Sequence, residues 1–335
     1  MILSALDLSP VTGDATQAQA VRETIQVAKA AERFGYHRLW LAEHHNIAGL
    51  GSPAPEVLIA ALTQATHTIR LGSGGVMLVN YSPLKVAEVF MELEALAPGR
   101  IDLGLGRALG TDARTGGALR SVGSEAFPQY FHLLTSWLLD ASGKAPIGDD
   151  HPLRDIHANP AGPSHPEVFV LCTSEESAAF AGQMGVGMVF AEFIARTDGG
   201  PAVAAYRRAF EPSAFRVEPW AGIALIAYAA ETAEQAWAED ALRRAANVSM
   251  LSGRRRRFRD LAAADAFLAE HAGTPVRQMV EARTLAADPA AIHSRLVEKA
   301  RDAQADEVFV MATGPSLTAR IRSLELIADV HRSAA

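Results

Sequence analysis

Short apolar segments alternate with longer amphipathic segments along the whole chain. Eight of the short segments are apolar over nearly their full length, which is typical of strands buried on both faces. We predict strands at residues 2–8, 38–42, 69–79, 101–105, 168–171, 186–190, 220–228 and 308–311. Apolar residues at helical spacing predict helices at residues 16–34, from about 53, at 82–97, 124–139, 174–184, from about 201, and at 232–246, 289–303 and 316–331.

The order of these segments predicts the fold. A strand followed by a helix, repeated along the chain, favours a parallel sheet, and eight such units favour its closure into a (β/α)8 TIM barrel. An open doubly wound sheet is the alternative, but it more often has fewer strands. No linker divides the chain, so we expect one α/β domain over residues 1–335.

Residues 248–287 do not fit the alternation of strands and helices. This segment is basic, is longer than an ordinary loop, and contains Gly253 and Gly273, which can act as hinges. We expect an irregular insertion before the last βα unit, serving as a mobile lid over the site.

The composition excludes several classes of protein. Hydrophobic residues make up 49% of the 335 residues, and the net charge of −7 argues against nucleic acid as the main partner. The longest apolar run, residues 221–230, is about half as long as a membrane-spanning helix. The amino-terminal residues lack the basic region of a signal peptide, and the one cysteine, Cys172, suits a reducing compartment. We therefore expect a cytoplasmic protein that does not bind membranes.

Polar side chains gather where the predicted strands end. Glu43, His44 and His45 directly follow the second strand. The other strand ends carry Asn80, Tyr81, Arg107, Thr173, Ser174, Glu192 and Thr313. Because the active sites of TIM barrels lie at the carboxyl ends of the strands, these residues are the expected site. The opposite ends resemble simple turns. A histidine pair that only caps a strand is the structural alternative.

Two strand ends together predict a phosphate site. Thr173 and Ser174 place hydroxyl groups at the start of a helix, where free N–H groups and the helix dipole suit a phosphate. Ordinary N-capping explains the same residues, and the acidic residues Glu175 and Glu176 favour that explanation. Arg107, one strand away, changes the balance because its guanidinium can clamp a phosphate.

Gly74 and Gly75 interrupt the third predicted strand. Glycine inside a strand usually marks a bulge or the close approach of a ligand. A planar cofactor lying against the strand and a bend in the barrel wall both remain open.

Three other signals carry less weight. Gly104, Gly106 and Gly110 imitate a dinucleotide-binding motif, but the third glycine is misplaced and no helix follows directly. The run from Arg254 to Arg257 is best explained as a solvated loop. The adjacent pair His44–His45 lacks the i, i+4 spacing of a helical zinc site, so we expect no metal.

Taken together, these residues resemble the bacterial luciferase-like flavin-dependent monooxygenases. The matching segments are residues 31–36, 39–45, 71–76, 98–107, 173–177 and 305–307. The resemblance spans nearly the whole chain and is densest in its first 110 residues. The segment Glu43-His44-His45 is its most specific part, because it separates this branch from the relatives that use a deazaflavin.

The resemblance implies a barrel that binds reduced FMN, supplied by a separate flavin reductase. Oxygen would add to the flavin as a C4a-peroxide, which oxidises a small organic substrate. A homodimer is the expected assembly.

The resemblance also assigns roles to residues. His44 would be the catalytic group near the flavin. The cofactor-binding residues would be Ala42, Glu43, His45, Gly74, Gly75, Arg107, Ser174, Glu175 and Ser177. Among these, Arg107 would hold the FMN phosphate, and Gly74–Gly75 would carry a non-proline cis peptide beneath the isoalloxazine.

The sequence departs from the family in two places. Gly106 stands where the luciferases have a cysteine near the reacting flavin carbon, so light emission has no support. A second phosphate-binding arginine has Arg120 as its nearest candidate. Two other functions stay open: a deazaflavin- or NADPH-linked reductase on the same barrel, and a flavin-binding protein without turnover.

Overall fold

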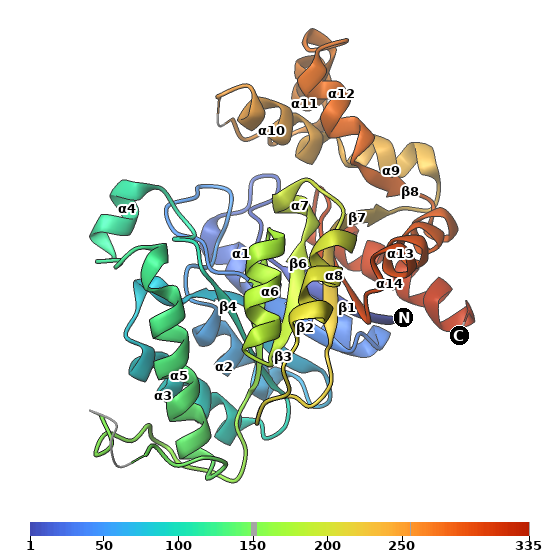
Figure 1. Ribbon diagram of the computed structural model, residues 1–335. Coiled ribbons are helices and arrows are strands. Elements are labelled where there is room, and N and C mark those ends of the chain that lie inside the picture. The colour runs from blue at the N-terminus through green and yellow to red at the C-terminus, as the bar shows by residue number, and fades with distance from the viewer. Residues whose placement is uncertain (149–152, 255, 335) are drawn as a thin grey trace.

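A computed structural model of the protein describes residues 1–148, 153–254 and 256–334. Eight parallel strands form a closed barrel surrounded by helices, which confirms the predicted (β/α)8 fold (Figure 1). The barrel strands are β1 (Ile2–Asp7), β2 (Arg38–Leu41), β3 (Arg70–Met77), β4 (Ile101–Gly106), β5 (Glu167–Cys172), β6 (Gly187–Ala191), β7 (Ala221–Ala229) and β9 (Glu307–Ala312). The ring closes because β9 pairs with both β7 and β1. A short extra strand, β8 (Leu285–Ala287), pairs with the end of β7.

The helices follow the strands much as the apolar pattern predicts. Their bounds are α1 (Gln17–Phe34), α2 (Pro55–Ala65), α3 (Pro83–Leu96), α4 (Ala113–Ala118), α5 (Phe127–Ala141), α6 (Glu175–Gln183), α7 (Glu192–Ala195), α8 (Gly200–Ala209), α9 (Ala233–Glu239), α10 (Ala241–Leu251), α11 (Leu261–Glu270), α12 (Pro275–Ala282), α13 (Pro289–Ala303) and α14 (Leu317–Ala334). Local chemistry sets several boundaries. Thr16 and Gln19 form a capping box that begins α1, and Gly35 ends it in a left-handed conformation with φ of 83°. None of the described helices is long and apolar enough to cross a membrane.

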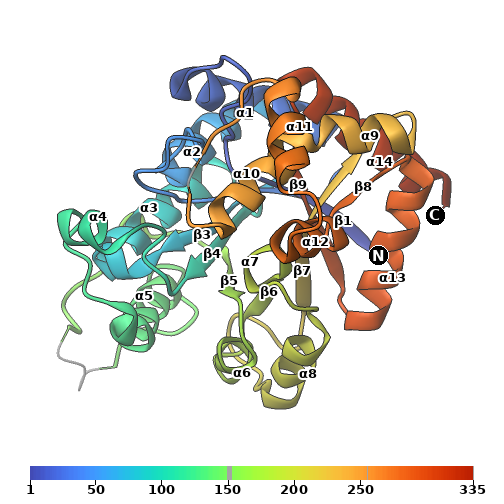
Figure 2. The same ribbon diagram turned by 90° about the horizontal axis from the view of Figure 1, so that it is seen from above.

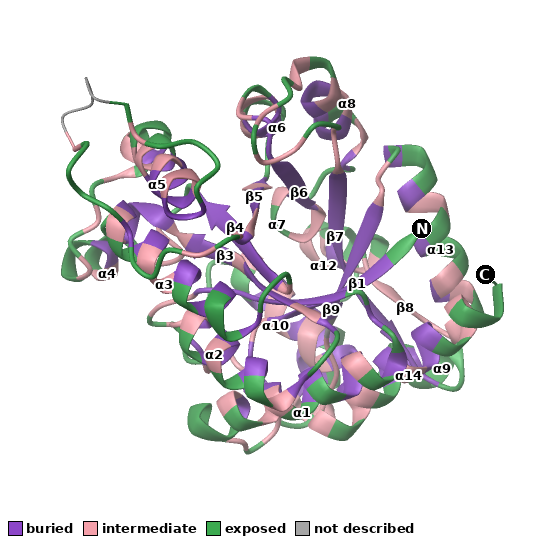
Figure 3. Ribbon diagram, turned by 90° about the horizontal axis from the view of Figure 1, so that it is seen from below, coloured by how far each residue is buried: buried purple, intermediate pink, exposed green. Residues whose placement is uncertain are grey.

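Two apolar layers hold the barrel together. Between the strands and the helices lies the main core, where nearly every strand residue is buried (Figure 3). A second cluster fills the inside of the barrel and consists of Leu6, Trp40, Phe169, Val189, Ala224, Phe309 and Met311. The Trp40 and Phe309 rings lie 4.5 Å apart between centroids. The interior is therefore packed, and a site can form only at one of its ends.

The segment predicted to be irregular is helical, so that prediction is wrong. Residues 248–287 contain the end of α10, the helices α11 and α12, and strand β8. These helices bury a small core of their own, with Val248, Phe258 and Phe267 among its members. Helices α10–α12 lie above the carboxyl ends of the barrel strands (Figures 1 and 2).

One part of the arginine run in this insertion is also not simply solvated. The Arg257 guanidinium donates to the Gly13 carbonyl, in the loop after β1, at 2.7 Å. This bond ties the insertion, which follows β7, to the loop after β1, two strands away around the barrel. Residue 255 of the run lies outside the described residues.

The first residues of the strands add a network of buried charges to the turns at the amino ends, which the sequence analysis did not predict. Asp102 is fully buried and accepts from Arg38 at 2.8 Å, from the Trp40 indole at 2.9 Å and from Arg70 at 2.6 Å. Arg38 also donates to Glu307 at 3.0 Å. Because a buried charge is tolerated only when it is paired and hydrogen-bonded, these residues form a closed ionic floor beneath the apolar interior.

Glu307 is the titrating member of this floor. Burial raises the pKa of its carboxyl to about 7, although Arg38 and a hydrogen bond from Ser4 act in the opposite direction. The carboxyl would titrate near pH 4.5 in the unfolded chain. Between these two values the folded protein holds a proton that the unfolded chain has released, so raising the pH lowers the free energy of unfolding.

We therefore expect Glu307→Gln to flatten the pH dependence of stability. The free energy of unfolding of the wild type should contain a component that falls from about pH 4.5 to 7, and the variant should lack it. Denaturant unfolding at several pH values measures the difference. Glu92→Gln, at an exposed carboxyl on α3, is the matched control and should follow the wild type. Parallel curves for the wild type and Glu307→Gln would contradict the assignment.

Candidate active site

A buried carboxylate organises the carboxyl end of β2 and β3. Glu43 is completely buried, and its two oxygens accept from the Met77 backbone N–H at 2.9 Å, the Asn80 amide at 3.2 Å and the Tyr81 hydroxyl at 3.0 Å. His45 Nε2 lies 2.8 Å from the same carboxylate. Both oxygens of Glu43 are thus occupied by protein groups, and the side chain joins the loop after β2 to the end of β3.

The neighbours of Glu43 respond to its charge. Burial raises the pKa of Tyr81, and the Glu43 carboxylate raises it further. Burial and Glu43 likewise raise the pKa of the nearby Glu56 carboxyl. Tyr81 consequently remains a hydrogen-bond donor across the physiological range.

His44 is separated from this network. Its Nδ1 atom is buried and has no hydrogen-bond partner among the described residues. Burial lowers the pKa of its imidazole, while a hydrogen bond with the Gly110 backbone acts in the opposite direction. The lowered pKa favours the neutral ring near pH 7, in which one nitrogen can accept a proton. Of the two adjacent histidines, His45 is bound into the Glu43 network and His44 has a free ring nitrogen.

Two further buried polar atoms at this end are unpartnered among the described residues. They are Asn80 Oδ1, just after β3, and Thr313 Oγ1, just after β9. Together with His44 Nδ1 they come from the ends of three barrel strands. A buried polar group without a partner costs about 1–3 kcal/mol, so three at one end indicate a surface suited to a polar ligand.

The glycine pair at the third strand has a packing explanation. The bond between Gly74 and Gly75 is cis, as the resemblance implies, and the pairing with β4 shifts register there. A Cβ on Gly74 would lie 3.0 Å from Leu6, and one on Gly75 would lie 2.8 Å from the Gly104 carbonyl. Both missing side chains therefore face protein. The register shift marks a bulge in the barrel wall, and the cis peptide remains a candidate contact for a cofactor.

Met77 contributes to the site without any signal in the sequence. Its side chain occupies the space beside two glycines, because a Cβ on Gly106 would lie 2.6 Å from its Cε and one on Gly110 2.8 Å from its Cγ. The thioether of Met77 thus packs against both glycines. Sequence reasoning missed Met77 because an apolar residue at a strand end looks like ordinary core.

A separate cavity lies at the ends of β4 and β5. It has a volume of about 360 Å³ and is lined by Arg107, Ser124, Glu125, Phe127, Pro128, Val170, Leu171, Glu176, Ser177, Ala179, Phe180 and Gln183. The predicted cation and hydroxyl, Arg107 and Ser177, thus face the same space. Arg107 is half exposed and lies 3.3 Å from Glu176 in an exposed ion pair that is worth little.

The other residues of the predicted phosphate site do not line this cavity. Ser174 and Glu175 lie at the start of α6, and Arg120 lies elsewhere. Ser174 caps α6 through a reciprocal bond with Ser177, and the exposed Glu175 begins the helix. N-capping is therefore confirmed. Arg120 is exposed and is not among the described residues that line the cavity. Ala42 is buried, and its N–H bonds to the Asp7 carbonyl at 3.3 Å.

Comparison with known proteins places this arrangement in context. A model of the luciferase-like monooxygenase family matches residues 1–307. A protein of Escherichia coli strain K12, named luciferase-like monooxygenase, is 36% identical, and the match covers 98% of this chain and 96% of that protein. The crystal structure of apo-MsnO8 is 32% identical with a TM-score of 0.87 and covers 99% of this chain and 98% of that one.

A more distant structure shows the fold alone. The oxygenating constituent of 3,6-diketocamphane monooxygenase from Pseudomonas putida, solved in complex with FMN, is 16% identical with a TM-score of 0.70. It covers 98% of this chain and 97% of that one.

The role of Glu43 leads to a stability prediction. Glu43→Gln replaces an acceptor oxygen by an amide donor in a buried site that supplies mainly donors. We expect the free energy of unfolding to fall by roughly 1–3 kcal/mol, the cost of a buried group left unsatisfied. Denaturant unfolding measures it, with Glu92→Gln as an exposed control that should change it by less than about 0.5 kcal/mol. Equal stabilities of the two variants would show that the network does not hold the strand ends.

Proposed function

Because this chain belongs to the luciferase-like monooxygenase family, we propose that it binds reduced FMN at the carboxyl ends of its barrel strands and uses oxygen to oxidise a small organic substrate. The observation that carries the proposal is the set of unpartnered buried atoms on His44, Asn80 and Thr313. They line one end of a packed barrel, on the side where this fold places active sites. Reduced FMN held there would supply the electrons that activate oxygen for oxidation of the substrate.

The phosphate of FMN is assigned to Arg107. Its guanidinium faces a cavity together with Ser177, and the start of α6 with Ser174 and Glu175 lies beside them. The competing ion pair with Glu176 is exposed and weak, so a phosphate dianion can displace it.

His44 is assigned to proton transfer. Its imidazole is neutral near pH 7, and the unpartnered Nδ1 atom can take a proton from a reacting group and return it. Glu43 acts as a positioning residue because it fixes the loop that carries His44, while His45 lies in the Glu43 network. The peptide at Gly74–Gly75 and the backbone of Ala42 border the same mouth.

The insertion at residues 248–287 is assigned to a lid. It lies over the strand ends and is fastened to the rim by the bond from Arg257 to Gly13. Releasing that bond would open the mouth, and remaking it would keep water from the reacting flavin. We further propose a separate flavin reductase as the source of reduced FMN, a cytoplasmic location and a homodimeric assembly.

A first prediction concerns cofactor affinity. Arg107→Ala should weaken FMN binding about ten- to a hundredfold, because a charge-assisted bond contributes roughly 1.5–3 kcal/mol. Riboflavin, which lacks the phosphate, should bind the variant and the wild type equally. Fluorescence titration compares them, and Arg120→Ala is the control that should leave both affinities unchanged. If riboflavin weakens as much as FMN, Arg107 does not meet the phosphate. A loss of FMN affinity in Arg120→Ala would show that Arg120 is a second arginine that contacts the phosphate.

A second prediction concerns chemistry. His44→Ala should bind FMN nearly as the wild type does but lose about 10²–10⁴-fold in the rate of the oxygen-dependent step. His45→Ala should instead lower stability or FMN affinity, because His45 lies in the Glu43 network. Single-turnover absorbance of each reduced complex after mixing with oxygen separates the two. A wild-type trace from His44→Ala would overturn the assignment.

A further inference from the structure

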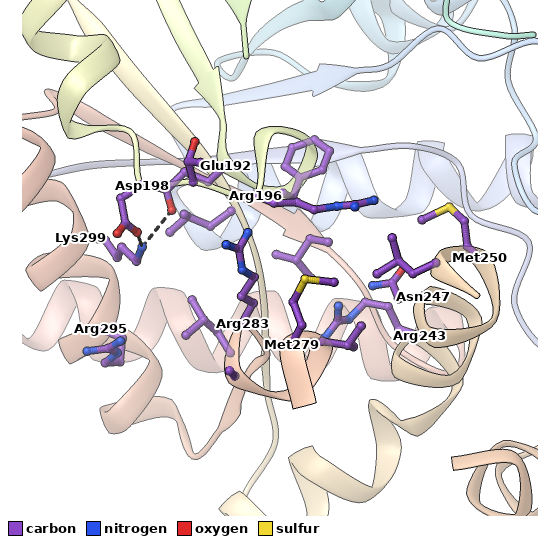
Figure 4. A pocket seen from close by; sticks show the side chains of 18 residues that line it. Glu192, Arg196, Asp198, Arg243, Asn247, Met250, Met279, Arg283, Arg295 and Lys299 are labelled. Atoms are coloured by element: carbon purple, nitrogen blue, oxygen red, sulfur yellow. Dashed lines mark hydrogen bonds and ion pairs between the residues drawn. The ribbon is translucent and has the colours of Figure 1, made fainter. Parts of the chain in front are cut away.

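A cavity lies between the insertion and the ends of β6 and β7. Its volume of about 690 Å³ falls in the range of small-molecule sites. One wall comes from α7 and the residues after it, another from α10 and α12, and a third from α13 (Figure 4). It is distinct from the smaller cavity that Arg107 lines.

Most of the charged residues that line this cavity are already compensated. Lys299 lies 3.1 Å from Glu192 and also pairs with Asp198. Arg243 makes two bonds to Asp240, at 2.7 and 2.6 Å, and Arg295 pairs with Glu298. These groups hold the walls together and leave little net charge for a ligand.

Two arginines in the cavity make no side-chain hydrogen bond or ion pair within the described part of the chain. They are Arg196, at the end of α7, and Arg283, just after α12. They come from different walls, one from the barrel and one from the insertion (Figure 4). Asp198 also lines the cavity, and the charge of Arg283 contributes to lowering the pKa of its carboxyl, but the ion pair of Asp198 is with Lys299. Guanidinium groups that form no ion pair are suited to binding an anion.

The backbone at Arg196 adds a second, independent observation. Arg196 has a φ of 59°, a left-handed conformation that ends α7 and that glycine adopts most easily. A long charged side chain in this position costs more than glycine would. The turn at the end of α7 thus fixes where the Arg196 side chain leaves the cavity wall.

The remaining lining is apolar and adaptable. It includes Leu225, Ile226, Met250, Leu251 and Met279. Methionine side chains adjust to irregular shapes, so they suit the carbon chain of a ligand better than a single rigid outline.

We propose that this cavity binds the substrate, and that the substrate is a small organic acid. Arg196 and Arg283 hold its carboxylate, while the methionines and aliphatic residues contact its carbon chain. The proposal rests on the proposed function, because it names the class of molecule that the flavin-dependent reaction would oxidise.

The position of the cavity fits this role. Ile226 and Phe193 line it and also pack against the cluster inside the barrel, which contains Leu6 and Trp40. Leu6 and Trp40 in turn contact Gly74, at the Gly74–Gly75 peptide. The floor of the cavity is therefore continuous with the apolar layer next to this peptide, where the flavin ring is proposed to lie.

The test is a binding experiment that needs no turnover. Hexanoate and its neutral counterpart hexanamide are titrated into the full-length protein by calorimetry, with and without saturating oxidised FMN. The wild type should bind hexanoate at least about tenfold more tightly than hexanamide. Arg196→Met combined with Arg283→Met should abolish this preference, and each single variant should reduce it.

Arg295→Met is the matched control, because Arg295 lines the same cavity but is already paired with Glu298. It should keep the wild-type preference for hexanoate. The proposal is overturned if hexanoate does not bind the wild type, if hexanamide binds as well, or if the double variant keeps the preference. If the double variant weakens FMN but not riboflavin, the arginines belong to the cofactor phosphate instead.

Failure of the proposed function gives a different result. In that case hexanoate binding and its arginine dependence persist, but the reduced FMN complex consumes no oxygen.

Discussion

The arrangement of the proposed site depends on the burial of one carboxylate. Glu43 has no access to water, so each of its oxygens must find donors within the protein. It finds them in the Met77 backbone, the Asn80 amide and the Tyr81 hydroxyl, with His45 at the same carboxylate. These contacts set where β3 ends and how the loop after β2 turns. They also bind the second histidine of the pair and leave the ring nitrogen of His44 unpartnered.

The two ends of the barrel use buried charge in different ways. At the amino ends, Asp102 and Arg38 are closely paired, which suits a rigid floor. At the carboxyl ends, His44, Asn80 and Thr313 each keep a polar atom that has no partner in the described part of the chain. The packed interior between them, centred on Trp40, transmits the rigidity of the floor to the mouth. Buried charge thus serves mainly to pair and pack at the amino ends, whereas the carboxyl ends carry the polar atoms assigned to the site.

Much of this architecture could be predicted from sequence, and the failures have physical reasons. The eight βα units were readable because burial on both faces makes strands continuously apolar, and Glu43 to His45 stood out as charge at the end of such a strand. The helices within residues 248–287 were missed because they pack against one another, so their apolar stripes are short. The ionic floor was missed because Asp102 and Glu307 pair with residues far along the chain. The position of Met77 could not be predicted from sequence, because its side chain packs against Gly106 and Gly110, which lie on another strand and the loop after it.

The central claim is that this barrel controls the reaction of reduced FMN with oxygen. The most direct measurement is stopped-flow absorbance of the wild-type complex, formed anaerobically with reduced FMN and then mixed with oxygenated buffer. The account predicts a flavin trace with at least one phase that free reduced FMN lacks, together with consumption of oxygen. A trace identical to that of free reduced FMN, or a complex that holds reduced FMN without consuming oxygen, would contradict it.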